Sequence, residues 1–319
     1  MTLICSGSLA FDRLLSVPGV FGDSLTGISP EMFNICLLVE KVKRTYGGTA
    51  GNVAYNLGLL GEKPLIVASL GDDPDGGDYR QRLAGLGLPL DAVITQKGRT
   101  TAGATIVTDS RDNMFNFFHP GAMNAATGFD PASLPGPVSD HLAIVSPGGA
   151  GEMLRLCRAY RSLGLKYIFD PGQQLPVFNP EELVDMLDGS FMFICNTFEF
   201  ESYKSATGLA DDDLFRHTEA IIVTRGSAGS DLLVPGRGSQ HVGAVPVNQV
   251  VNATGAGDAF RAGLLAGLSR GEHLITACRL GATVAAFCVE ADGTQDQHFT
   301  PAQVMARHAS AFKEQINIL

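Results

Sequence analysis

The chain has 319 residues, enough to bury a large core as one α/β domain, with or without a smaller appendage. Its 23 lysine and arginine residues against 33 aspartate and glutamate residues give a formal net charge of −10, and no basic run interrupts this balance. This charge argues against nucleic acid or an anionic membrane as a partner. No apolar run approaches the length of a membrane span, and Met1–Cys5 is too short for a signal peptide and lacks a basic flank.

The cysteines indicate a reducing environment. All six stand singly, mostly among apolar residues, and none forms a C-x-x-C pair. We therefore expect buried thiols in a cytoplasmic protein, without a disulfide or zinc framework. The six are Cys5, Cys36, Cys157, Cys195, Cys278 and Cys288.

A short apolar strand is expected near the N-terminus, over residues 3–6. Gly7 and Ser8 end this strand, and Asp12 follows closely, in the region past a strand's carboxyl end where open α/β sheets bind ligands. An ordinary turn aspartate is the alternative interpretation of Asp12.

The next segment does not follow the rhythm of the main sheet. Residues 13–34 contain several prolines and glycines, so we expect irregular chain with a short turn of helix near Glu31. Residues 35–46 partly alternate between apolar and polar side chains, which predicts one or two strands outside the main sheet. These strands could form a lid.

Two glycines mark the start of the first long helix. Gly47 and Gly48 precede a helix that is expected to end at Gly61, with Asn52 in its first turn, so that a ligand could approach the backbone closely. Tight helix packing on small residues is the alternative. The elements expected after it are a strand at 65–70, a polar loop at 71–76 and a helix at 79–86.

A β-hairpin is expected over residues 102–108 and 114–118, joined by a polar turn. Its second strand is aromatic on both faces. One face can belong to a core while the other lines a pocket for a flat ring, although aromatic residues more often only pack in cores.

From residue 142 a regular βα alternation predicts a parallel sheet with helices on its faces. Each strand ends in glycine or polar residues, which all fall at the carboxyl edge of the sheet and suggest one long binding cleft. The expected strands are 142–145, 167–169, 191–195 and 220–224, and the expected helices are 151–164, 179–188 and 197–206. The polar segments are 146–149, 170–174, 196–199 and 224–226.

The remaining chain predicts a single α/β domain over residues 1–319. A weaker β-rich stretch covers 230–247, two helices close the chain at about 273–290 and 301–316, and no repeat or flexible linker marks a second domain. The smaller part of the molecule is expected to come from two insertions, at about 11–46 and 98–120.

The most informative stretch runs from Val250 to Gly263. A turn of glycine and alanine opens a helix of small residues, so the amides of Ala256, Gly257 and Asp258 can converge where the helix dipole adds positive charge. An anion hole beside the Asp258 carboxylate suggests group transfer to a hydroxyl, with Asp258 as base. A simple helix cap is the alternative.

The motifs resemble both signatures of the ribokinase-like (PfkB) carbohydrate and nucleoside kinases. They are Gly47-Gly48-Thr49-Ala50-Gly51-Asn52, the N-x-x-E of residues 196–199 and the G-A-G-D of residues 255–258. The resemblance spans nearly the whole chain and, within the family, is strongest to prokaryotic adenosine kinases. It implies a central mostly parallel sheet, flanking helices and a small β-sheet lid over the acceptor site.

The resemblance also implies ATP-dependent transfer of the γ-phosphoryl group to the 5′-hydroxyl of a ribonucleoside, with adenosine preferred. Asp258 is then the base, and the amides of Gly255, Ala256 and Gly257 form the anion hole. The ribose hydroxyls are assigned to Asp12, Gly48 and Asn52, and the border of the nucleoside to Ser8, Cys36, Phe118, Gln173 and Gln174. Mg²⁺ and its waters are assigned to Asn196 and Glu199, and ATP to Asn196, Thr224, Arg225 and Gly226.

The sequence departs from the family pattern at one point. The family commonly has Asp-Thr before G-A-G-D, whereas this chain has Asn252-Ala253, which puts in doubt any monovalent cation site at this loop. No G-x-x-x-x-G-K-[ST] motif occurs, so the amide hole must replace the lysine of a Walker cradle.

Other functions compete with a nucleoside kinase. A sugar kinase of the same family would need more polar groups around its acceptor than Phe117, Phe118 and Cys36 offer. A non-catalytic nucleotide sensor and a dinucleotide-binding reductase are alternatives from other classes, but no strand leads into the G-x-G-x-x-G that a reductase needs. An exposed lid edge strand could pair with a second copy and give a homodimer.

Overall fold

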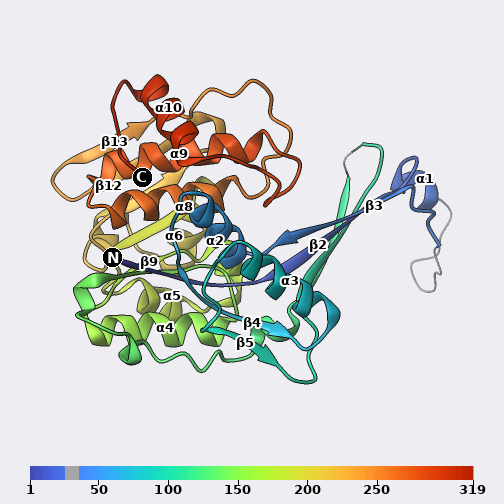
Figure 1. The fold of residues 1–319 in the computed structure, drawn as a ribbon, viewed down its shortest axis with the longest axis horizontal. Coiled ribbons are helices and arrows are strands. Elements are labelled where there is room, and N and C mark those ends of the chain that lie inside the picture. The colour runs from blue at the N-terminus through green and yellow to red at the C-terminus, as the bar shows by residue number, and fades with distance from the viewer. Residues whose placement is uncertain (26–35, 112, 319) are drawn as a thin grey trace.

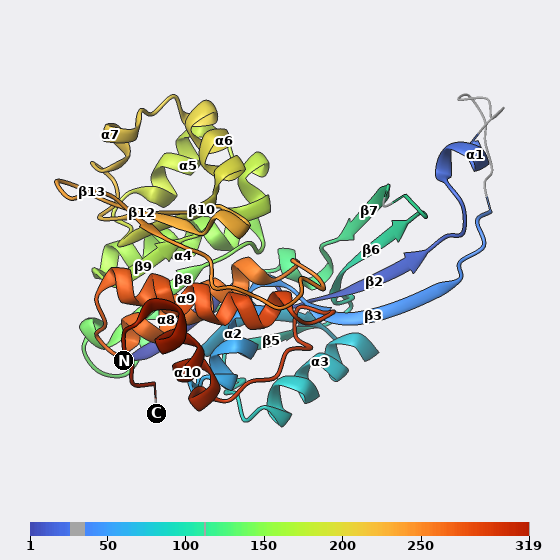
Figure 2. The same ribbon diagram turned by 90° about the horizontal axis from the view of Figure 1, so that it is seen from above.

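The structure is a computed structural model, and it describes residues 1–25, 36–111 and 113–318. A large sheet lies between two layers of helices, and a smaller sheet projects from one side of this body (Figures 1 and 2). The sheet edge beside this projection carries the loops that the sequence marks as functional.

Nine strands of the described residues form the large sheet. They are β1 (Thr2–Ser6), β4 (Leu65–Gly71), β5 (Val93–Gln96), β8 (His141–Val145), β9 (Lys166–Phe169), β10 (Met192–Asn196), β11 (Ile221–Thr224), β12 (Ser230–Val234) and β13 (Gly238–Val242). Their order is β13-β12-β11-β10-β9-β8-β1-β4-β5. Only the pairs β11–β12 and β12–β13 are antiparallel, so the expectation of a mostly parallel sheet is confirmed.

Helices cover both faces of this sheet. One layer contains α2 (Thr49–Leu59), α3 (Pro74–Gly85), α8 (Ala256–Ser269) and α9 (Leu274–Val289), with α10 (Pro301–Phe312) packed against α9 (Figure 2). The other layer contains α4 (Ala150–Leu163), α5 (Pro180–Leu187) and α6 (Thr197–Thr207). Two short helices are α1 (Phe21–Leu25) and α7 (Asp211–Leu214).

The central strands are apolar on both sides because both sides are covered. Ile144 and Ile168 belong to the core shared with α8 and α9, whereas their neighbours Val145 and Tyr167 belong to the core beneath α4 and α5. Alternate residues of a strand point to opposite faces, so an apolar run without alternation is what a doubly covered parallel strand requires.

The projecting sheet has four strands, which we call the lid: β2 (Ala10–Ser16), β3 (Lys41–Gly47), β6 (Ala102–Thr108) and β7 (Met114–His119). Their order is β3-β2-β6-β7, and the expected β6–β7 hairpin is confirmed. The expectation of irregular chain from residue 13 is wrong as far as Ser16. β2 pairs with β3 on one side and β6 on the other, and these long-range pairings outweigh the local sequence.

Register decides which lid residues share a face. Asp12 lies opposite Thr45 and Ala104, and Ala104 lies opposite Phe118. Residues directly opposite each other project to the same side, so Asp12 and Phe118 share one face and Phe117 lies on the other.

Several local expectations need correction. α3 begins at Pro74, inside the expected polar loop, because the Asp73 side chain accepts a hydrogen bond from the Gly76 amide and proline is favourable in the first helical turn. The four-residue strand β5 and a 3-10 helix at Gly172–Val177 were not expected. The turn predicted near Glu31 lies outside the described residues.

Two further expectations concern the burial of the thiols and the presence of a membrane-spanning helix. Five of the six cysteines are buried and free, whereas Cys36 is exposed, contrary to the expectation of buried thiols. None of the helices in the described residues is long and apolar enough to cross a membrane.

Candidate active site

The polar loops predicted to form a cleft do meet at one edge of the large sheet. The last residues of β1, β8 and β9 lie side by side, and Asn196 at the end of β10 lies opposite Thr224 at the end of β11. Parallel strands end at the same edge, so the sequence signal was sufficient here.

The turn before α8 leaves main-chain donors unpaired. Gly255 caps the helix with φ of 81°, a left-handed conformation that favours glycine. The first helical hydrogen bond runs from the Ala259 amide to the Gly255 carbonyl, so the Gly257 and Asp258 amides have no helical acceptor. The Ala256 amide instead donates to the Ala253 carbonyl at 3.2 Å, which weakens the prediction that it belongs to the anion hole.

Asp258 is a partly buried carboxylate in the first turn of α8. Burial raises its pKa to about 7, against the opposing effects of the Arg261 guanidinium and of the hydrogen bond from Asn52. The Asn52 Nδ2 atom donates to the Asp258 Oδ2 atom at 2.8 Å. A carboxylate with a pKa near neutrality can gain a proton during a reaction and lose it afterwards.

Asn52 is itself fixed by a buried hydrogen-bond network. The Gln295 Nε2 atom donates to the Asn52 Oδ1 atom at 3.1 Å and to the Tyr79 hydroxyl at 2.8 Å, and that hydroxyl donates to the Gly47 carbonyl at 2.7 Å. Gln295, Tyr79 and Asn52 are all buried. The network ties the catalytic turn to α2, α3 and the inner end of the lid.

The lid contributes a second carboxylate to the same region. Asp12 lies against Gly47, where an added Cβ would come within 2.7 Å of the Asp12 Oδ2 atom. Burial raises the pKa of Asp12, and its charge adds to the rise in the pKa of Asp258. Asp12, Asn52 and Asp258 therefore form one polar cluster, and Phe118 lies on the lid face that carries Asp12, two strands away on the edge strand β7.

Ser8 and Gly48 have structural roles in addition to any contact with a ligand. The Ser8 hydroxyl accepts a hydrogen bond from the Thr49 amide at 3.0 Å, at the start of α2. Gly48 has φ of 84°, and an added Cβ would meet the Ser8 carbonyl at 2.6 Å. Close packing of backbone on backbone therefore accounts for this glycine.

The loop after β9 separates the two predicted glutamines. The Gln174 Nε2 atom donates to the Gly148 carbonyl at 2.9 Å, whereas the Gln173 side chain is exposed. Gln173 is therefore the glutamine with free donors and acceptors for a ligand.

Asn196 and Glu199 form a capping box at the start of α6. The Asn196 Oδ1 atom accepts from the Glu199 amide at 2.9 Å, and the Glu199 Oε2 atom accepts from the Asn196 amide at 2.8 Å. The predicted metal residues thus have a structural function that requires no metal. Their remaining oxygens still suit Mg²⁺, which takes one or two protein ligands and completes its shell with phosphate and water.

No group of three or more acidic, histidine or cysteine side chains in the described residues could hold a metal ion by itself. Burial raises the pKa of Glu199, and Asp170 adds to that rise. Asp170, Glu199 and Asp258 place negative charge around the Arg261 guanidinium, and a divalent cation would add positive charge to balance it.

The other predicted ATP residues follow β11. The Thr224 hydroxyl donates to the Cys195 carbonyl at 3.3 Å, and Arg225 forms an ion pair with Asp231 at 2.7 Å. Gly226 is exposed with φ of 56°. These residues border an open edge of the sheet next to Asn196.

Cys36 does not join this cluster. It precedes the outer end of β3, where Lys41 lies opposite Ser16, and its thiol makes no hydrogen bond within the described residues. Its predicted contact with a nucleoside stays a prediction.

Two connections were not foreseen from the sequence. Arg261 forms a buried bidentate ion pair with Asp170, at 2.5 and 2.6 Å. Lys43 of the lid contacts Asp292 and Asp296 in the loop after α9, at 2.8 and 3.2 Å. No local pattern in the sequence indicated either contact, because each one joins segments that are distant in the sequence.

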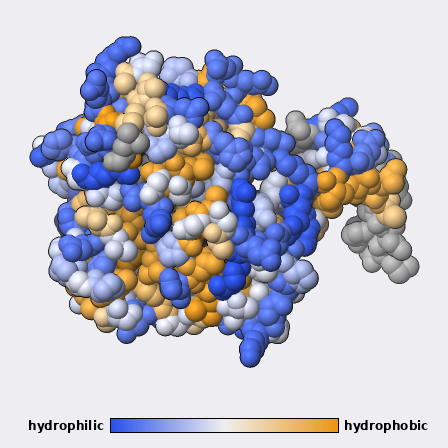
Figure 3. All heavy atoms as spheres, in the orientation of Figure 1, coloured by the Kyte–Doolittle hydropathy of each residue, from blue (hydrophilic) through white to orange (hydrophobic). Residues whose placement is uncertain are grey.

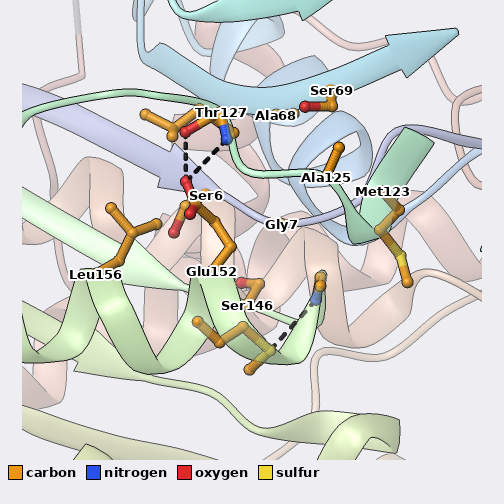
Figure 4. Close-up of a pocket in the computed structure, with 14 residues that line it drawn as sticks. Ser6, Gly7, Ala68, Ser69, Met123, Ala125, Thr127, Ser146, Glu152 and Leu156 are labelled. Atoms are coloured by element: carbon orange, nitrogen blue, oxygen red, sulfur yellow. Dashed lines mark hydrogen bonds between the residues drawn. The ribbon is translucent and has the colours of Figure 1, made fainter. Parts of the chain in front are cut away.

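A small, partly open cavity lies near the ends of β1, β4 and β8 (Figure 4). Its volume is about 20 Å³, enough for a water molecule but not for a nucleoside. The Ser146 hydroxyl lines it without a hydrogen-bond partner among the described residues, whereas Thr127 and Glu152 bond to each other. This cavity is therefore too small to be the binding site of an organic substrate.

The fold and this site define the class of protein. Residues 24–301 match the pfkB family carbohydrate kinase description, so the chain belongs to the pfkB family. Its fold is the ribokinase-like one, with a large mostly parallel sheet and a small sheet beside it.

Within that family the chain is similar to nucleoside kinases. It is 28% identical to the nucleoside kinase of Methanocaldococcus jannaschii, over 92% of each chain. Its structure is similar to that of the Burkholderia thailandensis nucleoside kinase in complex with inosine, with 33% identity, a TM-score of 0.87 and 99% of each chain covered. The same Burkholderia enzyme in an ADP-inosine complex gives a TM-score of 0.84 and 33% identity, covering 99% of this chain and 97% of that one.

Proposed function

We propose that this protein is an ATP-dependent nucleoside kinase that transfers the γ-phosphoryl group of ATP to the 5′-hydroxyl of a ribonucleoside, with adenosine preferred. The observation that carries the proposal is the position of Asp258, beside unpaired helix amides and hydrogen-bonded to Asn52. The Asp258 carboxylate can accept a proton while the unpaired amides bind an anion. Phosphoryl transfer to a hydroxyl needs both a proton acceptor and an anion site.

The reaction exchanges two bonds at the γ-phosphorus. The 5′-oxygen forms a bond to phosphorus, the bond from phosphorus to the bridging oxygen of ADP breaks, and the hydroxyl proton passes to the Asp258 carboxylate. The free amides of the turn, those of Gly257 and Asp258 above all, and the amide of Gly255 stabilise the phosphoryl oxygens. Mg²⁺ held through Asn196 and Glu199 would neutralise phosphate charge.

The acceptor site lies between α2 and the lid. Asp12, Gly48 and Asn52 would hold the ribose hydroxyls, and Phe118 would stack on the base from the lid face that carries Asp12. Ser8, Cys36, Gln173 and Gln174 would border the nucleoside, while ATP would lie along Asn196 and residues 224–226. Closure of the lid would exclude water and limit hydrolysis of ATP.

A sugar kinase is the second candidate, because the family includes carbohydrate kinases and Asp12 and Asn52 would serve any polyol. The aromatic side chains of the lid favour a nucleoside, since a free sugar has no aromatic base on which Phe118 could stack. Adenosine and inosine differ in one exocyclic group of the base, and the Burkholderia relative was solved with inosine.

We also propose that the lid can pair with a second copy through β7. This edge strand is exposed along its whole length, with Phe117 61% and Phe118 51% exposed. Figure 3 shows apolar surface along the projecting lid. Light scattering coupled to size exclusion tests this: a dimer supports it, and a monomer at all concentrations contradicts it.

A substrate panel tests the main proposal. Adenosine, inosine, guanosine, cytidine, ribose and fructose 6-phosphate are each incubated with ATP and Mg²⁺, and ADP and the phosphorylated product are measured. We expect nucleoside 5′-monophosphates, with adenosine the best acceptor. Turnover on the free sugars alone would contradict the nucleoside assignment, and no turnover on any acceptor would support a non-catalytic sensor.

A further inference from the structure

A buried arginine lies beside the catalytic turn. Arg261 is on α8, only 7% exposed, and its Nε and Nη2 atoms donate to both carboxylate oxygens of Asp170. Its Nη1 atom has no hydrogen-bond partner among the described residues. A guanidinium carries five N–H donors in a fixed plane, so the pair with Asp170 leaves donors on the side of the guanidinium away from Asp170.

The free nitrogen lies against the first turn of α8. Side chains on a helix lean toward its N-terminus, so Arg261 reaches back over Gly257, four residues earlier. A Cβ atom added to Gly257 would stand 2.9 Å from the Nη1 atom. Gly257 is exposed, so the Nη1 atom lies beside a solvent-facing part of the turn, next to the unpaired amides.

We propose that Arg261 is a further catalytic residue, whose Nη1 atom donates to the phosphoryl group while that group occupies the anion hole. Asp170 orients the guanidinium from behind, and the absence of a side chain on Gly257 leaves room for the contact. This inference rests on the proposed function, because it needs a phosphoryl group at the turn.

The balance of charge supports this role. Asp170, Glu199 and Asp258 all interact with the single positive charge of Arg261. A buried ion pair with one carboxylate contributes little to stability on balance, so the Arg261–Asp170 pair is not explained well as a stabilising contact alone. Charge spreads over the phosphoryl oxygens during transfer, and a preoriented guanidinium stabilises that charge.

A purely structural role is the competing explanation. The Arg261–Asp170 pair joins α8 to the loop that carries Gln173 and Gln174, so its loss could simply displace the nucleoside. The two roles differ in which ligand loses affinity. A displaced loop weakens adenosine and AMP alike, whereas a lost phosphoryl contact weakens AMP and spares adenosine.

The experiment uses the variants Arg261→Met, Arg261→Lys and Gly257→Ala. Gly257→Ala keeps the arginine and the amide but places a methyl group 2.9 Å from the Nη1 atom, close enough to displace it, and alanine favours the helix. It therefore remains informative if Arg261→Met, which leaves Asp170 unpaired, does not fold. Gly77→Ala is the matched control, a helical glycine of α3 with open space around its Cβ position.

We measure kcat with adenosine and ATP, and the dissociation constants of adenosine and AMP by calorimetry. Arg261→Met and Gly257→Ala should lower kcat at least about 100-fold, the scale of losing one preoriented donor, with Arg261→Lys between them and the wild type. AMP affinity should fall at least tenfold, and adenosine affinity should stay within about threefold. Equal losses for both ligands, or unchanged AMP affinity and kcat, would overturn the inference. A wild type without nucleoside turnover would instead refute the proposed function.

Discussion

The catalytic turn and the lid bring their residues to the same cleft in different ways. Around the turn, Asn52 is held by Gln295, and Arg261 by Asp170, all buried. The lid is instead joined to the body by partly exposed ion pairs, which include those of Arg13 and Arg44 with Asp75 of α3 and those of Lys43 with Asp292 and Asp296. Its outer half leaves large apolar side chains exposed, as Figure 3 shows.

This difference implies that the two regions have different roles in the proposed reaction. Groups that must meet developing charge sit in a network whose buried partners fix them, which is what preorganised catalysis requires. The lid residues that the proposed function assigns to the nucleoside sit on a sheet that projects from the body, which suits a part that closes on a ligand. Changes in the first region should therefore act on kcat, and changes in the second on KM.

The largest effect is expected for Asp258→Asn. The variant keeps the shape and an acceptor for Asn52 but cannot take up the proton, so kcat should fall by about 1,000-fold. The dissociation constant of adenosine should stay within about threefold. Initial-rate assays measure kcat, and calorimetry measures the dissociation constant of adenosine. The control is Asp91→Asn, which changes an exposed aspartate before β5.

Thermal unfolding of the same variant checks that it is folded. The pKa of Asp258 is raised from 3.8 to about 7 in the folded protein. As the pH rises, the Asp258 carboxyl therefore loses its proton first in the unfolded chain. The free energy of unfolding falls as the pH rises between those two values. Asp258→Asn removes that loss, and its melting temperature at pH 8 should exceed the wild type's by roughly 2 °C. Near pH 4 the melting temperatures of the variant and the wild type should differ little. A variant that melts below the wild type at pH 8 would contradict the expected direction.

A smaller effect is expected for Asn52→Leu. The hydrogen bond from Asn52 favours the ionised form of Asp258, so its loss raises the pKa of the carboxyl. For the wild type, kcat/KM should decline below a pH of about 7, and for the variant this decline should begin at higher pH. At pH 7 the variant should lose about 10- to 100-fold in kcat/KM.

Asn248→Leu is the control, since its exposed side chain makes no hydrogen bond within the described residues. An Asn52→Leu profile that falls in parallel with the wild type, at an unchanged apparent pKa, would mean that Asn52 serves only substrate binding.

Much of the fold and part of the site could be predicted from the sequence, for reasons seen in particular residues. The strands of the large sheet were predictable because coverage on both faces leaves continuous apolar runs, and Asp258 because the G-A-G-D turn is local. β2 was missed over 13–16 because its partners lie 25 to 31 residues away in β3 and 92 residues away in β6. The Asn52–Gln295 and Arg261–Asp170 contacts were missed for the same reason, since no local pattern records a contact between distant segments.

Two adjacent phenylalanines of β7, Phe117 and Phe118, provide a sharper test of the lid. Phe118 shares a face with Asp12, whereas Phe117 projects to the opposite side. Phe118→Ala should raise the KM for adenosine about tenfold, the scale of one lost base–aromatic stack, with kcat little changed. Phe117→Ala should leave KM within twofold. Equal effects of both substitutions would mean that the lid acts through its stability and not through contact with the base.

The smallest effect is expected for Lys43→Met. Lys43 links β3 to Asp292 and Asp296, but the three side chains are largely exposed, so the link should contribute little. KM for adenosine should rise two- to fivefold, and the difference from wild type should shrink at high salt. Lys41→Met, at the outer end of the same strand and without an ion pair in the described residues, is the control. A change in kcat with no change in KM would contradict the division between the two regions.

A crystal structure with adenosine and a non-hydrolysable ATP analogue directly measures the distance between the adenosine 5′-oxygen and the Asp258 carboxylate. We expect the adenosine 5′-oxygen within about 3 Å of an Asp258 carboxylate oxygen, and the γ-phosphate at the Gly257 and Asp258 amides. An adenosine bound elsewhere, or bound in the cleft with its 5′-oxygen turned away from Asp258, would contradict the assignment of this carboxylate as the base.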